Sequence, residues 1–222
     1  MRECADLQAS RSKLLKKDIF GATTLVSSDA GFVILRDARA GAASMRWIAR
    51  KLLAREARAL AALEGTSGIP ELLNVDSATL ERTYVDGLPM QEGKPTDPQY
   101  FRAAAQLLRR IHRQNVAHND LAKEPNFLVT GQGEPAMIDF QLAWFAPHRG
   151  TIFRLLARED IRHLLKHKRT YCPQQLTQRE KRILDNPSLP ARLWMRTAKP
   201  VYLFITRRIL GWQDREGAGD RS

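Results

Sequence analysis

Two polar stretches in the middle of the chain decide how its fold is interpreted: residues 118–126 read HNDLAKEPN, and residues 137–141 read MIDFQ. The first follows a long helical pattern, and the second ends an apolar run. Each stretch is therefore expected to hold its polar side chains on a loop beside a rigid element. A single loop aspartate is usually a turn former or a helix cap. The order of the whole set instead favours a chemical role, because carboxylate and amide oxygens can orient a nucleophile and bind a hard cation.

Upstream of these stretches, the sequence predicts a small β-rich region with one helix. Short β-type runs at residues 18–20, 23–27 and 32–35 are separated by turn signals. A helical period covers residues 45–63, and two further strands are expected within residues 69–85. Three strands, a helix and two more strands are thus the expected order.

The second half of the sequence predicts a mostly helical region. Glycine and proline residues between positions 87 and 98 indicate a connector. We place a boundary there, between an N-terminal lobe of residues 1–86 and a C-terminal lobe of residues 87–222. An apolar stripe predicts a helix over residues 100–113, and the chain after Thr151 has a helical pattern.

The two polar stretches resemble the protein-kinase superfamily, in which HxDL with a spaced Asn forms the catalytic loop and IDF forms the metal-binding turn. The resemblance implies an α+β, bilobal protein-kinase-like fold, with a small β-rich N-lobe and a mostly helical C-lobe. It also implies ATP and Mg²⁺ as cofactors. Asp120 would receive the proton of the attacking hydroxyl, and Asn126 and Asp139 would be the metal ligands. Lys123 is a second candidate catalytic residue, and His118 is expected to brace the loop by hydrogen bonds.

The same resemblance assigns three residues to the binding of ATP. A kinase strand ends in a Lys that reaches the phosphates and pairs with a Glu on the following helix. Here the strand ends in Arg36, and Glu56 lies twenty residues further on. Arginine is larger than lysine, and its guanidinium is planar and forked, so the exchange is not neutral. The alternative is that Arg36 and Glu56 are two solvated surface charges. Within TYVDG, residues 83–87, Val85 would donate its N–H to adenine, although a plain turn explains the segment equally well.

Five features depart from the kinase pattern. The sequence has no GxGxxG motif between the first two strands, where only Gly21 is available. The interval from Asp120 to Asn126 is one residue longer than in H-R-D-L-x-x-x-N. Asn119 stands where the kinases have Arg, and Gln141 stands where they have Gly. No A-P-E element follows, so the C-lobe is expected to lack a full activation segment and its control by phosphorylation.

These departures make residues 14–145 similar to the RIO-type atypical serine/threonine kinases and to the bacterial lipopolysaccharide core sugar kinases. The implied activity is an ATP- and Mg²⁺-dependent transfer of phosphoryl to a hydroxyl of a protein or an envelope sugar. The alternative is a pseudokinase that keeps the fold as a nucleotide-binding, membrane-associated or nucleic-acid-associated scaffold. Arg36 and the missing glycine-rich loop motivate that alternative.

Composition and charge limit the class and the location of the protein. The 222 residues are 43% apolar and 27% charged, which is ordinary for a soluble protein and excludes collagen and disordered classes. Cys4 and Cys172 are too far apart in sequence for a disulfide framework or a metal knuckle. Since the first twenty residues contain no secretory h-region, we expect a cytoplasmic location.

The positive charge of the chain is concentrated towards its C-terminus. Residues 1–146 hold 19 Lys and Arg against 17 Asp and Glu, whereas residues 147–222 hold 17 against 7. The tail of residues 189–212 interleaves aromatic and basic side chains. It would either contact the inner face of the cell membrane peripherally or pack on the C-lobe with its cations turned outward. Nucleic acid is the least favoured partner, because no binding motif is present.

Overall fold

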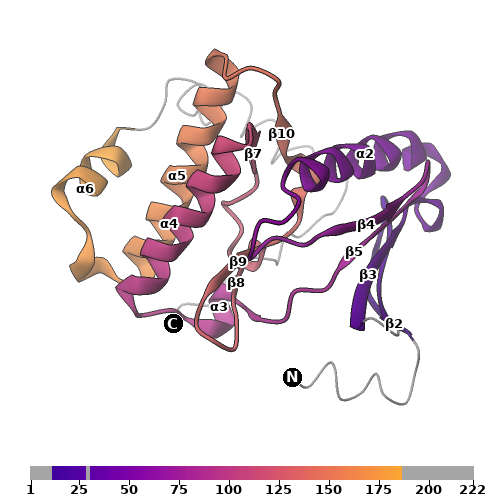
Figure 1. The fold of residues 1–222 in the computed structure, drawn as a ribbon, viewed down its shortest axis with the longest axis horizontal. Helices are drawn as coiled ribbons and strands as arrows, with labels where there is room; N and C mark the ends of the chain where they lie inside the picture. Colours follow the sequence, from indigo (N-terminus) through magenta and orange to yellow (C-terminus); the bar gives the residue numbers. More distant parts are fainter. Residues whose placement is uncertain (1–11, 29–30, 187–222) are drawn as a thin grey trace, which may run out of the picture.

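The N-terminal half of the chain forms a five-stranded antiparallel sheet in the computed structural model, which describes residues 12–28 and 31–186 (Figure 1). Its strands follow the order β1-β2-β3-β5-β4. Their bounds are Ser12–Asp18 (β1), Gly21–Ser28 (β2), Gly31–Asp37 (β3), Leu72–Val75 (β4) and Thr79–Thr83 (β5).

The first strand corrects the sequence prediction. Residues 18–20 were expected to be a strand, but β1 ends at Asp18, and the next two residues form the turn to β2. The Asp18 carboxylate accepts the N–H of Phe20 at 2.8 Å and so closes this turn. Gly21 follows with φ +146°, where a Cβ atom would lie 2.4 Å from the Asp37 carbonyl oxygen. Because β1 is a largely exposed edge strand, it carries no alternation of apolar residues that could reveal it.

Helix α2 (Arg46–Ala62) packs on the sheet, and it lies where the sequence predicts a helix. Its inner face buries Ala49, Leu53 and Ala57 against Leu80 of β5. The last turn, including Leu60, joins the larger core of the C-terminal half. One helix therefore contacts both halves of the molecule.

The C-terminal half is built on helices α4 (Pro98–Arg113), α5 (Thr151–Tyr171) and α6 (Gln178–Asp185). Asp97 caps α4 by accepting the N–H of Gln99. The buried stripe of α4 packs in one core with the catalytic-loop region. These residues include Leu107, Leu108, Ile111, Leu121, Phe127 and Phe140.

Short elements between α4 and α5 hold the two polar stretches. Strands β6 (Leu88–Pro89), β8 (Phe127–Val129) and β9 (Pro135–Met137) form one small sheet in that order. Strand β7 (Val116–Ala117) pairs with β10 (Trp144–Phe145). The connector also contains a one-turn helix, α3 (Met90–Gly93), which the sequence did not predict. A helix of four residues next to glycine and proline leaves no periodic signal.

The predicted α+β arrangement is confirmed: a β-sheet N-terminal region is followed by a mostly helical C-terminal region. The lobe boundary at residues 86 and 87 stays a prediction, although the last strand of the large sheet ends at Thr83. In the part of the chain that the structure describes, no helix is long and apolar enough to cross a membrane. Cys4 and the tail of residues 189–212 lie outside the described residues.

Candidate active site

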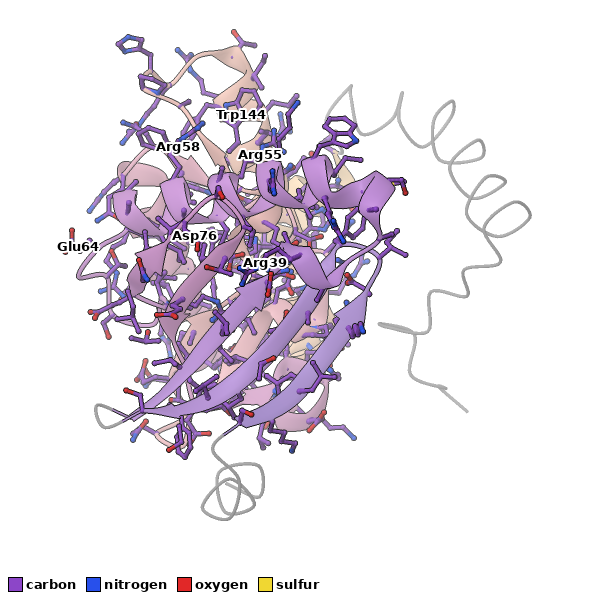
Figure 2. All side chains as sticks on the ribbon, turned by 90° about the vertical axis from the view of Figure 1, so that its right-hand side faces the viewer. Arg39, Arg55, Arg58, Glu64, Asp76 and Trp144 are labelled. Carbon is purple, nitrogen blue, oxygen red and sulfur yellow. The ribbon has the colours of Figure 1, made fainter. Side chains whose placement is uncertain are left out.

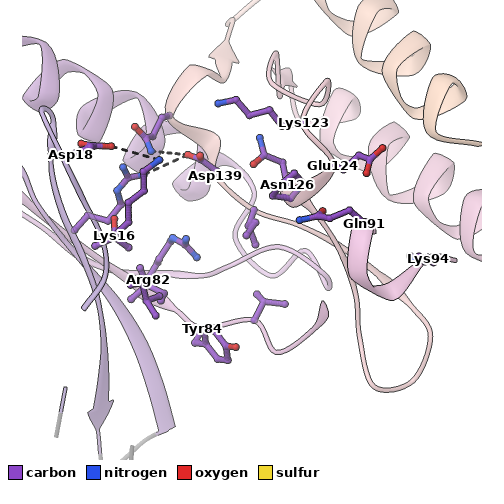
Figure 3. Close-up of a pocket in the computed structure, with 18 of the residues that line it drawn as sticks. Lys16, Asp18, Arg82, Tyr84, Gln91, Lys94, Lys123, Glu124, Asn126 and Asp139 are labelled. Atoms are coloured by element: carbon purple, nitrogen blue, oxygen red, sulfur yellow. Dashed lines mark hydrogen bonds and ion pairs between the residues drawn. The ribbon is translucent and has the colours of Figure 1, made fainter. Parts of the chain in front are cut away.

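A cleft of about 920 Å³ separates the large sheet from the C-terminal half, and five of the seven predicted site residues line it. These are Arg36, Val85, Lys123, Asn126 and Asp139. The other two lie behind the walls of the cleft, because Asp120 contacts Asn126 and Glu56 contacts Arg36. In Figure 3, Asn126 and Asp139 lie near each other on the C-terminal side, and Arg82 lies across the cleft.

The catalytic-loop candidates form one bonded group. Asn126 donates from Nδ2 to the backbone oxygen of Asp120 at 2.8 Å and to its Oδ2 at 3.1 Å. Lys123 Nζ lies 3.0 Å from the same Oδ2. The one-residue insertion between Asp120 and Asn126 therefore does not separate the two side chains, since a short 3₁₀ turn over Glu124–Asn126 takes up the extra residue.

These bonds fix the orientation of the Asn126 amide. Both acceptors belong to Asp120, so the NH₂ group must face them, and the amide oxygen is left for another partner. Asn126 is only 4% exposed. Its oxygen therefore has little freedom to turn away.

Asp160 on α5 supports the loop of residues 118–126, and the sequence did not reveal this role. Its carboxylate is buried and accepts the backbone N–H groups of His118 and Asn119, each at 2.8 Å. His112 Nε2 lies 3.1 Å from the same carboxylate. The only signal in the sequence is an acidic residue on the inner side of a predicted helix, about forty positions from the loop.

The loop backbone also explains why Asn119 stands beside Asp120. Asn119 has φ +62°, in the left-handed region that asparagine enters more easily than most residues. Its side chain donates to the Leu142 oxygen at 3.2 Å and so links this loop to the segment that follows Asp139. His118 braces the loop as expected, because its Nε2 lies 3.0 Å from the Ile138 oxygen and its ring packs on Phe140.

Asp139, the predicted metal ligand of the second stretch, has φ +66° and points into the cleft. Gln141 Nε2 donates to its Oδ1 at 2.8 Å. Burial opposes ionisation of Asp139, but nearby cationic side chains, Arg36 first among them, outweigh it and hold the pKa of the carboxyl below its ordinary value. The site therefore keeps this carboxylate charged at neutral pH.

On the sheet side, one buried carboxylate holds two guanidinium groups. Glu56 is fully buried, and its Oε2 accepts a hydrogen bond from Arg36 Nη1 at 2.8 Å. Arg82 Nε lies 3.3 Å from Glu56 Oε1. Arg36 Nη1 also lies 3.5 Å from Asp139 Oδ1, so this side chain bridges the two sides of the cleft. Arg36 and Glu56 are thus a buried pair, and the alternative of two solvated charges is wrong.

Arg82 is a site residue that the sequence analysis missed. It lies on β5 opposite Ile34 of β3, is 7% exposed and lines the cleft. Burial lowers its pKa from the ordinary value, and the attraction of Glu56 offsets this only in part. Its signal was the alternation of β5: Leu80 is buried, and Arg82, two positions on, points to the same side of the sheet.

The hairpin of β1 and β2 stands where a glycine-rich loop would cover the phosphates. Lys16, Asp18 and Thr23 from this hairpin line the cleft, and Lys16 Nζ lies 3.7 Å from Asp18 Oδ2. Val85 lines the same cleft beyond Tyr84, but its hydrogen bond to adenine stays a prediction.

The donor set fits Mg²⁺ when phosphate oxygens complete it. Asn126 supplies an oriented amide oxygen and Asp139 an ionised carboxylate. Mg²⁺ is commonly bound by one or two protein oxygens together with phosphates and waters. No group of three His, Cys, Asp or Glu side chains suited to a metal ion occurs among residues 12–28 and 31–186. These residues therefore suit a metal that arrives with a nucleotide.

No family model matches this sequence, and no curated protein matches it either. Solved structures do. The Rio2 kinase from Chaetomium thermophilum has a TM-score of 0.58 and 17% identity, over 82% of this chain and 66% of that one, just under two thirds of its length. The Rio2 kinase-ADP/Mg²⁺-phosphoaspartate complex from the same organism has a TM-score of 0.55 and 16% identity, over 94% of this chain and 75% of that one. The chain thus has a RIO-kinase-like bilobal fold, and the lipopolysaccharide kinase branch stays a prediction.

Proposed function

We propose that this protein is an ATP- and Mg²⁺-dependent phosphotransferase that moves the γ-phosphoryl group of ATP to a hydroxyl. The observation that carries the proposal is the convergence of the predicted residues on one cleft. Asp120, Asn126 and Lys123 are in mutual contact, and Arg36 reaches from buried Glu56 to Asp139. The similar fold of the Rio2 kinase-ADP/Mg²⁺-phosphoaspartate complex supports the choice of cofactors.

Asp120 would orient the acceptor hydroxyl and take its proton. Asn126 and Lys123 both contact Oδ2 of this carboxylate, so the carboxylate is oriented before the acceptor arrives. Lys123 is half exposed and can turn its ammonium group towards the transferred phosphoryl without losing contact with the loop. It would thereby balance the charge that develops during transfer.

Arg36 would bind the α- and β-phosphates while Glu56 holds its guanidinium in place. Arg82 shares Glu56, so the sheet side presents two guanidinium groups against one carboxylate and has positive charge left for the phosphates. Bound Mg²⁺ would neutralise phosphate charge from the Asn126 and Asp139 side. Val85 would contact adenine at the far end of the cleft.

The acceptor is proposed as a hydroxyl of a protein or of an envelope sugar such as the lipopolysaccharide core. A cytoplasmic protein that reaches the inner face of the membrane through its basic tail would meet either substrate. Nucleic acid is not proposed as a partner.

The test is incubation with γ-labelled ATP, Mg²⁺ and separate fractions of cell envelope, ribosomes and cytosol. We expect label in one fraction and a rate that falls by about 10²–10⁴-fold in Asp120→Asn. Treatment with hydroxylamine separates the products, because it releases an acyl phosphate and leaves a phosphate ester intact. Label transfer that is equal in Asp120→Asn would contradict the mechanism.

A scaffold without turnover is the second candidate, and the contact of Arg36 with Asp139 favours it. An arginine so close to a metal ligand would compete with the metal for that carboxylate. Thermal-shift titration separates the candidates, because a ligand that binds the folded state raises its stability with concentration. The phosphotransferase requires stabilisation by ATP that depends on Mg²⁺ and is lost in Asp139→Ala, whereas the scaffold requires neither.

A further inference from the structure

The outward side of α2 carries an unbalanced row of basic residues. Counting 100° per residue, these side chains cover about half of the helix circumference, and all of them are exposed. Trp47 lies within the row and is 60% exposed. We call this surface the α2 basic face: Arg46, Trp47, Arg50, Lys51, Arg55 and Arg58, together with Trp144 of β10.

No acidic side chain balances this charge within the helix. The one acidic residue of α2, Glu56, is fully buried and accepts a hydrogen bond from Arg36. Among residues 12–28 and 31–186, none of the five basic side chains forms an ion pair. The next acidic residue along the chain, Glu64, lies beyond the end of α2 (Figure 2). A surface ion pair elsewhere, Arg39 with Asp37, shows that neighbouring basic residues do find partners.

Aromatic rings complete the α2 basic face. The Lys51 ammonium lies 4.8 Å from the centroid of the Trp47 ring, and the Arg55 guanidinium lies 5.8 Å from that of Trp144. Figure 2 shows Arg55, Arg58 and Trp144 together along one side of α2. Phe145, beside Trp144, is also 37% exposed. Basic and aromatic side chains are therefore mixed on this face.

We propose that the α2 basic face docks on an anionic lipid surface. Five unpaired cations on one helix face match a plane of negative headgroups. Indole rings are amphipathic and prefer the depth of the headgroups, where their apolar part is covered and their N–H stays hydrated. A nucleic acid fits less well, because single strands need open ring faces and a positive groove, whereas Lys51 and Arg55 already cover one face of each indole.

The experiment measures binding of the full chain to vesicles of phosphatidylglycerol and phosphatidylcholine, and to vesicles of phosphatidylcholine alone. The variant Arg50→Gln/Arg58→Gln removes two charges from the α2 basic face. The matched control, Arg102→Gln/Arg109→Gln, removes two exposed charges from α4. Both variants keep the basic tail of residues 189–212, so any contribution of the tail is common to them.

We expect the parent protein to bind anionic vesicles and to lose affinity as salt rises. The α2 variant should bind about 30-fold more weakly, from two basic residues near an anionic surface, and the α4 control should bind almost as well as the parent. Trp47→Ala should also weaken binding, without changing net charge. Circular dichroism and the Mg²⁺-ATP thermal shift should be unchanged in all variants, which separates docking from the proposed catalysis.

Three results would overturn the proposal. The parent could fail to distinguish anionic from neutral vesicles. The α2 and α4 variants could lose affinity equally, which would indicate an effect of total charge. A single-stranded RNA oligonucleotide could bind more tightly than the vesicles and depend more strongly on Arg50 and Arg58, which would make the α2 basic face a nucleic-acid surface.

Discussion

The two sides of the cleft are held in place by different kinds of interaction. On the C-terminal side, hydrogen bonds to buried groups hold the backbone of the loop of residues 118–126. Asp160 accepts two N–H groups of this loop, and His167 Nε2 lies 2.8 Å from the Leu121 oxygen. On the sheet side, Arg36 and Arg82 are held by one carboxylate, Glu56. The first arrangement fixes backbone, whereas the second fixes only side chains.

The hydrophobic core is larger on the C-terminal side of the cleft than on the sheet side. One large cluster of buried residues joins α4, α5, the small sheet and the last turn of α2. The large sheet has two small clusters, one under α2 around Leu53 and Leu80 and one that contains Leu25 and Ile34. Stability thus resides mainly in the C-terminal half, and the sheet side can adjust its position at lower cost when a nucleotide binds. Mutations in the C-terminal half should therefore lower the stability of the whole protein most, whereas mutations on the sheet side should mainly weaken ligand binding.

The largest effect is expected for Asp160→Ala, which tests the C-terminal side. The change leaves the His118 and Asn119 N–H groups buried without an acceptor, and we expect a loss of about 4 kcal/mol in the free energy of unfolding. Urea unfolding measures it. Asp185→Ala, at the exposed end of α6, should cost less than about 0.5 kcal/mol. A small effect of Asp160→Ala would mean that the loop does not depend on α5.

Glu56→Gln tests the sheet side. Glutamine keeps the volume and one acceptor, but it leaves the buried Arg82 guanidinium without its carboxylate and Arg36 with only Asp139 at 3.5 Å. We therefore expect the free energy of unfolding to fall by about 3 kcal/mol. Stabilisation by Mg²⁺-ATP should disappear as well, because Arg36 is no longer held. Glu64→Gln, just beyond the same helix, is the control for both measurements. If Glu56→Gln lowers the free energy of unfolding but leaves stabilisation by Mg²⁺-ATP unchanged, Glu56 does not hold Arg36 for nucleotide binding.

The dependence of stability on pH should come from the C-terminal half, since all five histidines of the chain lie between residues 112 and 167. Burial, with help from Lys166, lowers the pKa of His163 to about 4. In the unfolded chain His163 binds a proton near pH 6.5, whereas in the folded protein it stays neutral down to about pH 4. The stability that its neutral form contributes is therefore fully present above pH 6.5 and is lost as the pH falls towards 4. Burial lowers the pKa of His167 in the same direction.

We expect the free energy of unfolding to fall by about 2 kcal/mol between pH 7 and pH 5 through His163. Urea titrations at these two pH values measure the difference. His163→Gln should flatten most of the slope, because glutamine does not titrate. An unchanged slope in that variant would show that His163 is accessible to protons in the folded protein.

The sequence predicted the long helices well, because helices leave a local pattern, and the candidate site residues were chosen from motif order and spacing. The apolar period of α2 and α4 set their positions to within two residues at each end. Asp120, Asn126 and Asp139 were singled out because their types and spacing resemble a kinase motif. Their contacts in the structure agree with that prediction, and their roles stay predictions.

The missed features depend on tertiary structure. Asp160 is one of many charged residues on α5, and only the folded chain places it below a loop some forty residues away. Arg82 looked like a surface residue of a strand, because burial of a guanidinium needs a partner such as Glu56 from another element. Strand β1 had no buried face to produce a pattern. Local spacing thus identifies candidate reacting groups, whereas the residues that support them are set by packing.

Gln141→Leu addresses the point where the two sides of the cleft meet and should have the smallest effect. Gln141 and Arg36 both contact Oδ1 of Asp139, at 2.8 and 3.5 Å, and together they set the direction of the carboxylate. Loss of one hydrogen bond should cost about 1 kcal/mol, or about fivefold in the Mg²⁺-dependent affinity for ATP. Isothermal titration with and without Mg²⁺ measures it, with Gln106→Leu on the exposed side of α4 as the control. Weaker binding only with Mg²⁺ would show that Gln141 positions a metal ligand, whereas equal weakening in both titrations would show that it merely shapes the cleft.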